Sequence, residues 1–283
     1  MAERTSPTER QRRLGREVRR MRTAAGVSAE TAARLLGVDR SRLSNIEQGL
    51  RAISQERVQT LARACRCSND TYVAALINMA APAQRGWWNR YRDSLPAGLL
   101  DISEIEAHAW RMRTAHSVHI PGVLQTSDHA LAVFRVVVPA LSEHEVALRL
   151  AHRMERQQML DGTKPQEYVG VVHEAALRMQ FGGRKVARQQ LQHLLTVSER
   201  DHITLRIIPF EAGAFPGAGQ TVNYCEGPVP ELDTVQVDSA HGPEFLDGEV
   251  QLAKYRAHLD WMERIALSPA SSRDFISTVA RNL

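Results

Sequence analysis

The first 80 residues combine apolar positions at helical spacing with short breaks that end each helix. In residues 10–25, Leu14, Val18 and Met21 follow one another at intervals of four and three positions, which places them on one helix face. Glycine stops and Ser, Asp or Asn caps mark the limits of the later helices. The predicted helices cover residues 10–25, 28–36, 39–48, 54–65 and 69–80. Their short connections predict a helix-turn-helix unit within a five-helix head.

The predicted helix from Asp39 to Gln48 has a narrow apolar face formed by Leu43 and Ile46. Its opposite face carries Ser41, Ser44, Asn45 and Gln48, flanked by Arg40 and Arg42 in the first turn. Such a face is typical of a recognition helix, because polar side chains and guanidinium groups can reach base edges and phosphates in the major groove. The alternative is an ordinary amphipathic surface helix.

An acid, Glu47, lies towards the inner side of the same helix. A carboxylate there is not expected to face anionic DNA. We predict that Glu47 forms a structural ion pair inside the head, with Arg22 at the end of the first helix as its partner.

Charge is distributed unevenly along the chain. Residues 1–80 contain 15 arginines, no lysine and 8 acids, a net charge of +7, whereas the rest has 21 basic and 24 acidic residues, a net charge of −3. A basic head on a nearly neutral body indicates nucleic-acid binding. The alternative is a solvated arginine face without a partner.

The head also resembles a known family. Residues 10–80 are similar to the Xre (Cro/C1-type) helix-turn-helix regulators through the segment ETAARLLGVDRSRLSNIEQGLRAIS, with its Leu-Gly-Val turn and its Ile-Glu-x-Gly helix end. The resemblance implies a lambda-repressor-like fold in which helix 39–48 enters the major groove. It implies base contacts from Arg40, Ser41, Ser44 and Asn45, and phosphate contacts from Ser28, Arg42 and Arg51. Many members have Gln near the start of the second helix, where this chain has Ala29 and Glu30.

Aromatic residues are concentrated just after the head. Trp87, Trp88 and Tyr91 lie within five residues, and such amphipathic rings seldom sit free in a flexible linker. We expect them to form a clamp between head and body, or part of a dimer surface. Stacking on single-stranded nucleic acid is the alternative. With a helical stretch at Ile102–Met112, they form a connector that we place at residues 81–112.

Residues 113–283 mix predicted helices with short strands. Helices are predicted for the Ser142-capped segment LSEHEVALRLAHRMERQQML and for residues 186–198, 249–266 and 269–281. Strands are predicted at EYVGVV, HITLRIIPF, TVNYC and TVQVDS. This order predicts an α+β body around a small sheet, so the chain is mainly α with a smaller α+β part. We expect residues 113–283 to be an effector, partner-binding and dimerisation domain that follows the head at residues 1–80.

The body has a resemblance of its own. The segments IPGVLQT, RMERQQMLD, HEAALRMQFGG, QLQHLL and IIPFEAGAFPG occur in that order. They resemble the uncharacterised C-terminal domain attached to Xre heads in actinobacterial regulators, described as antitoxin-like regulators of the Scr type. The resemblance implies transcriptional control, often with a small protein partner encoded nearby.

No motif has the spacing of a catalytic or metal site. His116 and His119 lie three residues apart in a predicted extended stretch, on opposite faces, and Cys65-x-Cys67 lacks a second ligand pair. No enzymatic activity, metal or cofactor is therefore expected. The three cysteines, the absence of a secretory leader and the absence of a membrane-spanning run predict a cytoplasmic protein without membrane association, located on the nucleoid when bound to DNA.

These patterns favour a sequence-specific regulator of transcription that binds double-stranded DNA. We expect a homodimer on a palindromic operator, because one such head reads only a few base pairs. The C-terminal domain would modulate its activity. Two alternatives stay open, namely an antitoxin-like protein whose main role is to bind a small partner protein, and a sensor that responds to a small-molecule effector.

Overall fold

The computed structural model describes residues 6–81, 86–162, 165–217, 219–239 and 241–283. These residues form two compact units. The first unit comprises the chain up to residue 89 together with residues 228–232, and the second comprises residues 90–227 and 233–283. Helices predominate, and the second unit contains a six-stranded sheet. The expected combination of a helical head and an α+β body is confirmed.

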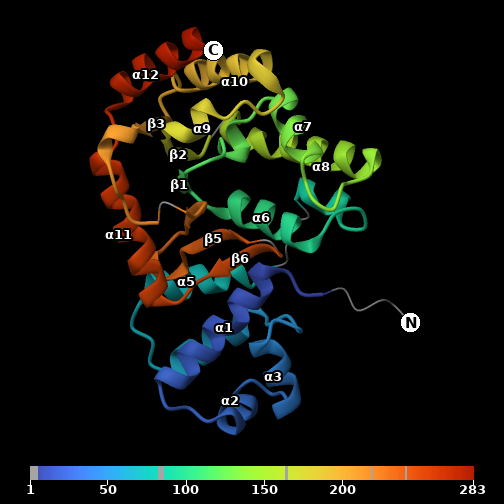
Figure 1. The fold of residues 1–283 in the computed structure, drawn as a ribbon. Helices are drawn as coiled ribbons and strands as arrows, with labels where there is room; N and C mark the ends of the chain where they lie inside the picture. Colours follow the sequence, from blue (N-terminus) through green and yellow to red (C-terminus); the bar gives the residue numbers. More distant parts are fainter. Residues whose placement is uncertain (1–5, 82–85, 163–164, 218, 240) are drawn as a thin grey trace. The chain divides into compact units, whose positions relative to one another are not determined.

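Five α-helices form the main part of the first unit (Figure 1). They are α1 (Glu9–Ala24), α2 (Ala29–Leu35), α3 (Arg40–Glu47), α4 (Gln55–Ala64) and α5 (Asp70–Met79). The residue before each helix accepts a hydrogen bond from a backbone N–H of the first turn, through the side chains of Thr8, Ser28, Asp39, Ser54 and Asn69. Each cap satisfies an amide that has no partner within its helix. The five predicted helices are confirmed, with ends that shift by one residue.

Helices α1 and α3 approach each other closely through two glycines. A Cβ atom at Gly15 would lie 2.6 Å from the carbonyl oxygen of Ile46 and 2.7 Å from the amide nitrogen of Gly49. Gly49 follows α3 with a φ of +75°, a conformation that favours glycine. Leu43 and Ile46 of α3 are each 1% exposed. The position of α3 is therefore set by backbone contact on one side and by its buried apolar face.

Residues 228–232 join the first unit from a distant part of the sequence. Val229 and Leu232 are buried in the same apolar cluster as the helices of the head. The Arg13 Nη2 donates to the carbonyl oxygen of Glu231 at 2.6 Å, and the Asn69 Nδ2 donates to the Glu231 Oε1 at 3.0 Å. This segment, which includes the short helix η5 (Pro230–Leu232), is therefore part of the head's core.

The second unit is built on a sheet with the strand order β3–β2–β1–β4–β5–β6. The strands are β1 (Arg111–His116), β2 (Glu167–His173), β3 (Ile203–Ile208), β4 (Val222–Glu226), β5 (Thr234–Ser239) and β6 (Gly242–Leu246). Strands β1, β2 and β3 pair in parallel, and the remaining neighbours pair antiparallel. Side chains alternate between the faces of such strands. Met112 and His116 of β1 therefore face one side of the sheet, and Ala115 faces the other.

Helices pack on both faces of this sheet (Figure 1). The helices of the second unit are α6 (Ala97–His108), α7 (Ser127–Arg135), α8 (Glu143–Arg156), α9 (Glu174–Arg178), α10 (Gly183–Val197), α11 (Glu249–Ile265) and α12 (Pro269–Asn282). Short 3₁₀ helices lie at η1 (Trp87–Tyr91), η2 (Gly122–Leu124), η3 (Gln157–Leu160) and η4 (Phe210–Ala212). Val172 of β2 packs in one apolar cluster with residues of α10 and α12, whereas Val171 packs in another with residues of α11.

The prediction of a helix over Ile102–Met112 is wrong at its C-terminal end. Helix α6 ends at His108, and Met112 lies in the central strand β1. Arg113 can be buried in this strand because it donates from Nη2 to Asp260 at 2.6 Å and from Nε to Glu263 at 2.9 Å, both on α11. These partners are about 150 residues away in the sequence, so the local pattern gave no sign of a strand.

Candidate nucleic-acid interface

Helix α3 presents the polar residues that the sequence placed on its outer face. The Asp39 Oδ1 accepts from the backbone nitrogen of Arg42 at 2.6 Å and fixes the start of the helix. With Leu43 and Ile46 buried, the opposite side is left open to solvent. Arg40, Ser41, Arg42 and Ser44 are exposed, and Asn45 is half-buried. The Gln48 Nε2 donates to the Ser44 Oγ at 3.0 Å, so these two polar side chains of the outer face are linked.

The other residues predicted to contact phosphates lie outside α3. Ser28 is the cap of α2, and its hydroxyl accepts from the backbone nitrogen of Thr31 at 3.1 Å. Arg51 lies in the connection between α3 and α4. Both are exposed. The first unit therefore carries Ser28, Arg42 and Arg51 at its surface, next to or within the helix-turn-helix pair α2–α3.

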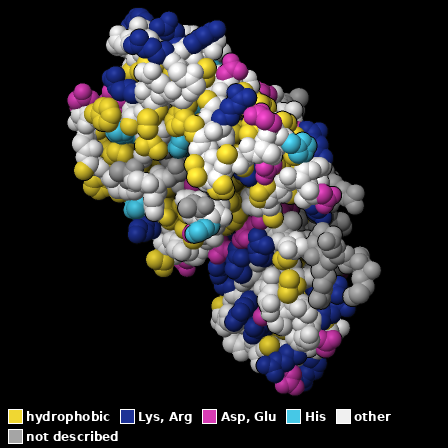
Figure 2. Space-filling view, turned by 45° about the vertical axis from the view of Figure 1, so that its right-hand side comes forward, with side chains coloured by type: hydrophobic (Ala, Val, Ile, Leu, Met, Phe, Trp, Pro, Cys, Tyr) yellow, Lys and Arg dark blue, Asp and Glu magenta, His cyan; other side chains and the backbone are white. Residues whose placement is uncertain are grey.

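The arginines of α1 and those near α3 differ in their partners. Arg12 and Arg16 pair with Glu9, Arg13 and Arg20 pair with Glu17, and Arg22 pairs with Glu47. Among the residues that the structure describes, no carboxylate pairs with Arg40, Arg42 or Arg51. Arginine side chains are spread over the surface of the first unit, which contains no lysine (Figure 2). A solvated, internally neutralised arginine face thus accounts for much of α1 but not for α3.

Glu47 pairs with Arg22, as the sequence predicted. The Arg22 Nε donates to Oε1 at 2.6 Å and the Nη2 donates to Oε2 at 3.0 Å, while the Nη1 donates to the carbonyl oxygen of Val27 at 2.9 Å. The hydrogen bond to Glu47 raises the pKa of Arg22 above its ordinary value. This arrangement joins the end of α1, the turn before α2 and the end of α3.

A second buried acid, Glu17, was not singled out from the sequence. It is fully buried in α1 and accepts from the Arg13 Nε at 2.7 Å and from the Tyr72 hydroxyl of α5 at 2.6 Å. Burial raises the pKa of Tyr72, and the hydrogen bond to Glu17 acts in the same direction. The four-residue spacing of Arg13 and Glu17 was the available signal, whereas the contact with Tyr72 depends on the tertiary fold.

The residues of the predicted aromatic clamp lie on both sides of the point in the sequence where the first unit ends and the second begins. Trp87 and Trp88 belong to the first unit and lie edge to face, with ring centroids 5.9 Å apart. Tyr91 belongs to the second unit, where its hydroxyl donates to the Glu155 Oε2 at 3.0 Å. Trp88 and Tyr91 are buried. Residues 82–85 of the predicted connector lie outside the described residues.

The described residues lack two features that would indicate another kind of function. They contain no cluster of His, Cys, Asp and Glu side chains arranged to hold a metal ion. Within the same ranges, no helix combines the length and apolar character that crossing a membrane requires.

Comparison with known protein families gives two matches. A model described as a helix-turn-helix domain matches residues 13–76, which include α2 and α3. A model described as a domain of unknown function (DUF5753) matches residues 99–278, which include the whole six-stranded sheet. No curated protein and no solved structure matches the chain.

Proposed function

The chain belongs to the DUF5753 family, and from that premise, with its N-terminal helix-turn-helix domain, we propose that it is a sequence-specific transcriptional regulator of the Xre (Cro/C1) type that binds double-stranded DNA. A helix-turn-helix domain indicates a DNA-binding regulator rather than an enzyme. The finer assignment to the Xre type rests on the sequence of α2 and α3 and on the turn between them.

The observation that carries the proposal is the exposed, unpaired positive charge of α3. Arg40 and Arg42 lie in its first turn without a carboxylate partner among the described residues, beside exposed Ser41 and Ser44. A duplex offers phosphates and guanine edges that such arginines can contact, and the serines are small enough to let the helix enter the groove.

The proposal gives each residue a role. Arg40, Ser41, Ser44 and Asn45 contact base edges, and Ser28, Arg42 and Arg51 contact phosphates. Ser44 is oriented by Gln48, and the ion pair of Arg22 with Glu47 holds the end of α3. The proposal divides the chain into a head (1–80), a connector (81–112) and a C-terminal domain (113–283). In this division, the rings of Trp87, Trp88 and Tyr91 belong to the connector and form the proposed clamp.

The same proposal includes a homodimer on a palindromic operator. One recognition helix reads a few base pairs, and two-fold symmetry doubles that contact area on DNA. The C-terminal domain would supply the dimer contact and modulate DNA binding. An antitoxin-like contact with a small protein partner is compatible with this arrangement and stays a prediction.

The test begins with selection of preferred duplexes from a randomised pool by the full-length protein. Equilibrium binding to the selected duplex and to a scrambled one is then measured for the native protein, Arg40→Ala and the control Arg63→Ala. Arg63 is an exposed arginine of α4, so its replacement removes the same charge away from α3. We expect Arg40→Ala to cost about 1–3 kcal/mol on the selected duplex only. Selection that yields no preferred duplex would refute sequence-specific binding.

A further inference from the structure

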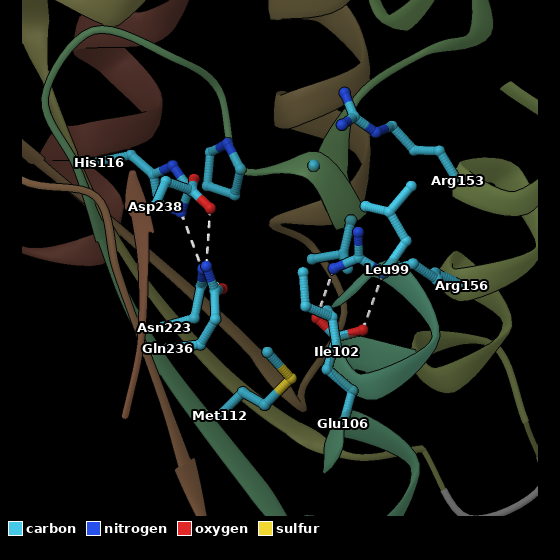
Figure 3. Close-up of a pocket in the computed structure, with 13 residues that line it drawn as sticks. Leu99, Ile102, Glu106, Met112, His116, Arg153, Arg156, Asn223, Gln236 and Asp238 are labelled. Carbon is cyan, nitrogen blue, oxygen red and sulfur yellow. Dashed lines mark hydrogen bonds and ion pairs between the residues drawn. The ribbon is translucent and has the colours of Figure 1, made fainter. Parts of the chain in front are cut away.

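The second unit contains a cavity of about 120 Å³ on one face of its sheet. Its floor is formed by Asn223 of β4 and by Gln236 and Asp238 of β5, together with His116 of β1. Helices α6 and α8 and the short helix η2 supply the remaining walls (Figure 3). An apolar cavity of about 150 Å³ holds benzene, so this one accommodates a ligand of about six non-hydrogen atoms. A nucleotide is too large for it.

Two arginines of α8 line this cavity, and among the described residues only Arg156 has a carboxylate bonded to it. The Arg156 Nε donates to the Glu106 Oε2 at 2.9 Å and its Nη2 donates to Oε1 at 2.5 Å. Arg153 instead donates to the neutral Gln125 Oε1 at 2.7 Å, and its guanidinium lies 4.2 Å from the centre of the Phe134 ring.

Arg153 has no direct ion pair within the described ranges, and the carboxylates of Asp238 and Glu106, which also line the cavity, offset its charge only in part. Burial, together with the positive charge of Arg156, lowers the pKa of Arg153 to about 9. An anion in the cavity would give Arg153 a directly bonded counter-ion, because a guanidinium binds a carboxylate through two parallel hydrogen bonds.

The polar floor opposite the arginines is a directed chain of hydrogen bonds (Figure 3). The Gln236 Nε2 donates to the Asp238 Oδ1 at 2.7 Å, and the Asn223 Nδ2 donates to the Gln236 Oε1 at 2.5 Å. The Asn223 Oδ1 is then the acceptor of its 3.3 Å contact with the His116 Nε2, which must carry the proton. Burial lowers the pKa of His116 to about 4, so its ring is neutral at pH 7.

The hydrogen bonds of this floor leave one acceptor, the His116 Nδ1, without a donor among the described residues. His116 is 7% exposed, and its Nδ1 is buried without a hydrogen-bond partner among the described residues. In the neutral ring with a proton on Nε2, the Nδ1 accepts a hydrogen bond. A hydroxyl or amino group on a bound molecule would satisfy it.

A glycine keeps the space in front of the arginines open. A Cβ atom at Gly122 of η2 would lie 3.6 Å from the Arg153 Nε and 3.9 Å from the Arg156 Nη1, at ordinary contact distance. A longer side chain at this position would extend into the cavity without any change of charge.

We propose that this cavity binds a small organic carboxylate that carries a hydroxyl or amino group. Its carboxylate pairs with Arg153, and its hydroxyl or amino group donates to the His116 Nδ1. Any effect of this ligand on DNA binding rests on the proposed function, whereas the binding itself does not.

The test is calorimetric titration of the full-length protein, without DNA, with lactate, alanine, propionate, lactamide and inorganic phosphate. Lactate or alanine should bind at least tenfold more tightly than propionate, which lacks the donor, and than lactamide, which lacks the charge. Because the assay contains no DNA, its failure leaves the proposed regulator function intact.

Three variants locate the binding. Arg153→Gln should weaken it at least tenfold, and the cavity-filling Gly122→Leu, which buries no new charge, should do the same. Arg135→Gln is the control, because Arg135 is an exposed arginine of α7 outside the cavity. The proposal is overturned if no carboxylate of the panel binds, if phosphate binds better than all of them, or if folded Gly122→Leu binds as the native protein does.

Discussion

The guanidinium of Arg22 and the carboxylate of Glu47 form a two-pronged ion pair between the last turn of α1 and the last residue of α3. Their side chains are 10% and 9% exposed, so little water screens them. The pair holds the carboxylate of Glu47 away from the exposed polar face of α3. On that face the carboxylate would repel phosphate. It also ties the end of the proposed recognition helix to the longest helix of the head.

Loss of this acid should destabilise the head. Glu47→Ala leaves the buried guanidinium of Arg22 without a counter-charge, and we expect it to lower the free energy of unfolding by about 3 kcal/mol. Urea unfolding measures the change. Glu30→Ala is the control, because Glu30 is an exposed acid of α2, and it should change stability by less than about 0.5 kcal/mol. Equal effects of the two substitutions would contradict a structural role for the pair.

The close approach of α1 and α3 should tolerate no side chain at Gly15. A methyl group there would clash with backbone atoms of Ile46 and Gly49. Backbone atoms cannot move aside as the end of a flexible side chain can. We expect Gly15→Ala to cost about 3 kcal/mol. Gly26→Ala is a matched comparison, since Gly26 has a φ of +68° but open space around its Cβ position, so only the backbone cost of about 1 kcal/mol applies. Thermal unfolding that ranks Gly26→Ala as the more harmful would contradict the packing described.

The segment 228–232 should contribute to the stability of the head. Leu232 is buried in the head's apolar cluster, and Leu232→Ala should lower the stability of the first unit by about 2–4 kcal/mol. Amide hydrogen exchange in α1 and α5 reports on this unit specifically. The same substitution at Leu50, which is 52% exposed, should have little effect. Unchanged exchange in Leu232→Ala would place the segment outside the folding unit.

Buried histidines should make the protein less stable as the pH falls below 7. Burial lowers the pKa of His129 to about 4, against about 6.5 in the unfolded chain, and both of its ring nitrogens are buried without partners among the described residues. Between these values the unfolded state binds a proton that the folded state does not, so stability is complete above pH 6.5 and declines towards pH 4.

The expected loss between pH 7 and pH 5 is about 2 kcal/mol for this one histidine. Urea unfolding across that range should show a shallower decline in His129→Leu than in the native protein. His144→Leu is the control, because His144 is an exposed residue of α8. An unaltered slope in His129→Leu would mean that His129 does not govern the decline.

The proposed phosphate contacts should appear in the salt dependence of DNA binding. The logarithm of the binding constant falls with the logarithm of salt concentration by about 0.9 for each phosphate contact. Removing Arg42 or Arg51 should reduce the slope by about one on any duplex, selected or scrambled. Arg63→Ala should leave it unchanged. A slope near zero for the native protein would remove the electrostatic basis of the proposed interface.

The sequence by itself determined the helical head and the polar face of α3. Caps such as Ser28 and Asp39 and the spacing of Leu43 and Ile46 act over a few residues, so their effect can be read along the chain. The pairing of Glu47 with Arg22 could also be inferred, because the wheel position of Glu47 required an internal partner. The contact of Tyr72 with Glu17 could not, since it joins helices that are far apart in the sequence.

Only the tertiary structure decided the central strand β1, the role of residues 228–232 and the cavity of the second unit. Arg113 can be buried in β1 because two acids of α11 pair with it. Leu232 is buried because it packs in the apolar cluster of the head. The cavity requires His116, Asn223 and Gln236, from three strands, to meet Arg153 of α8. The physical reason is the same in each case. These contacts join residues far apart in the chain, and no local propensity or period records which distant partner will complete them.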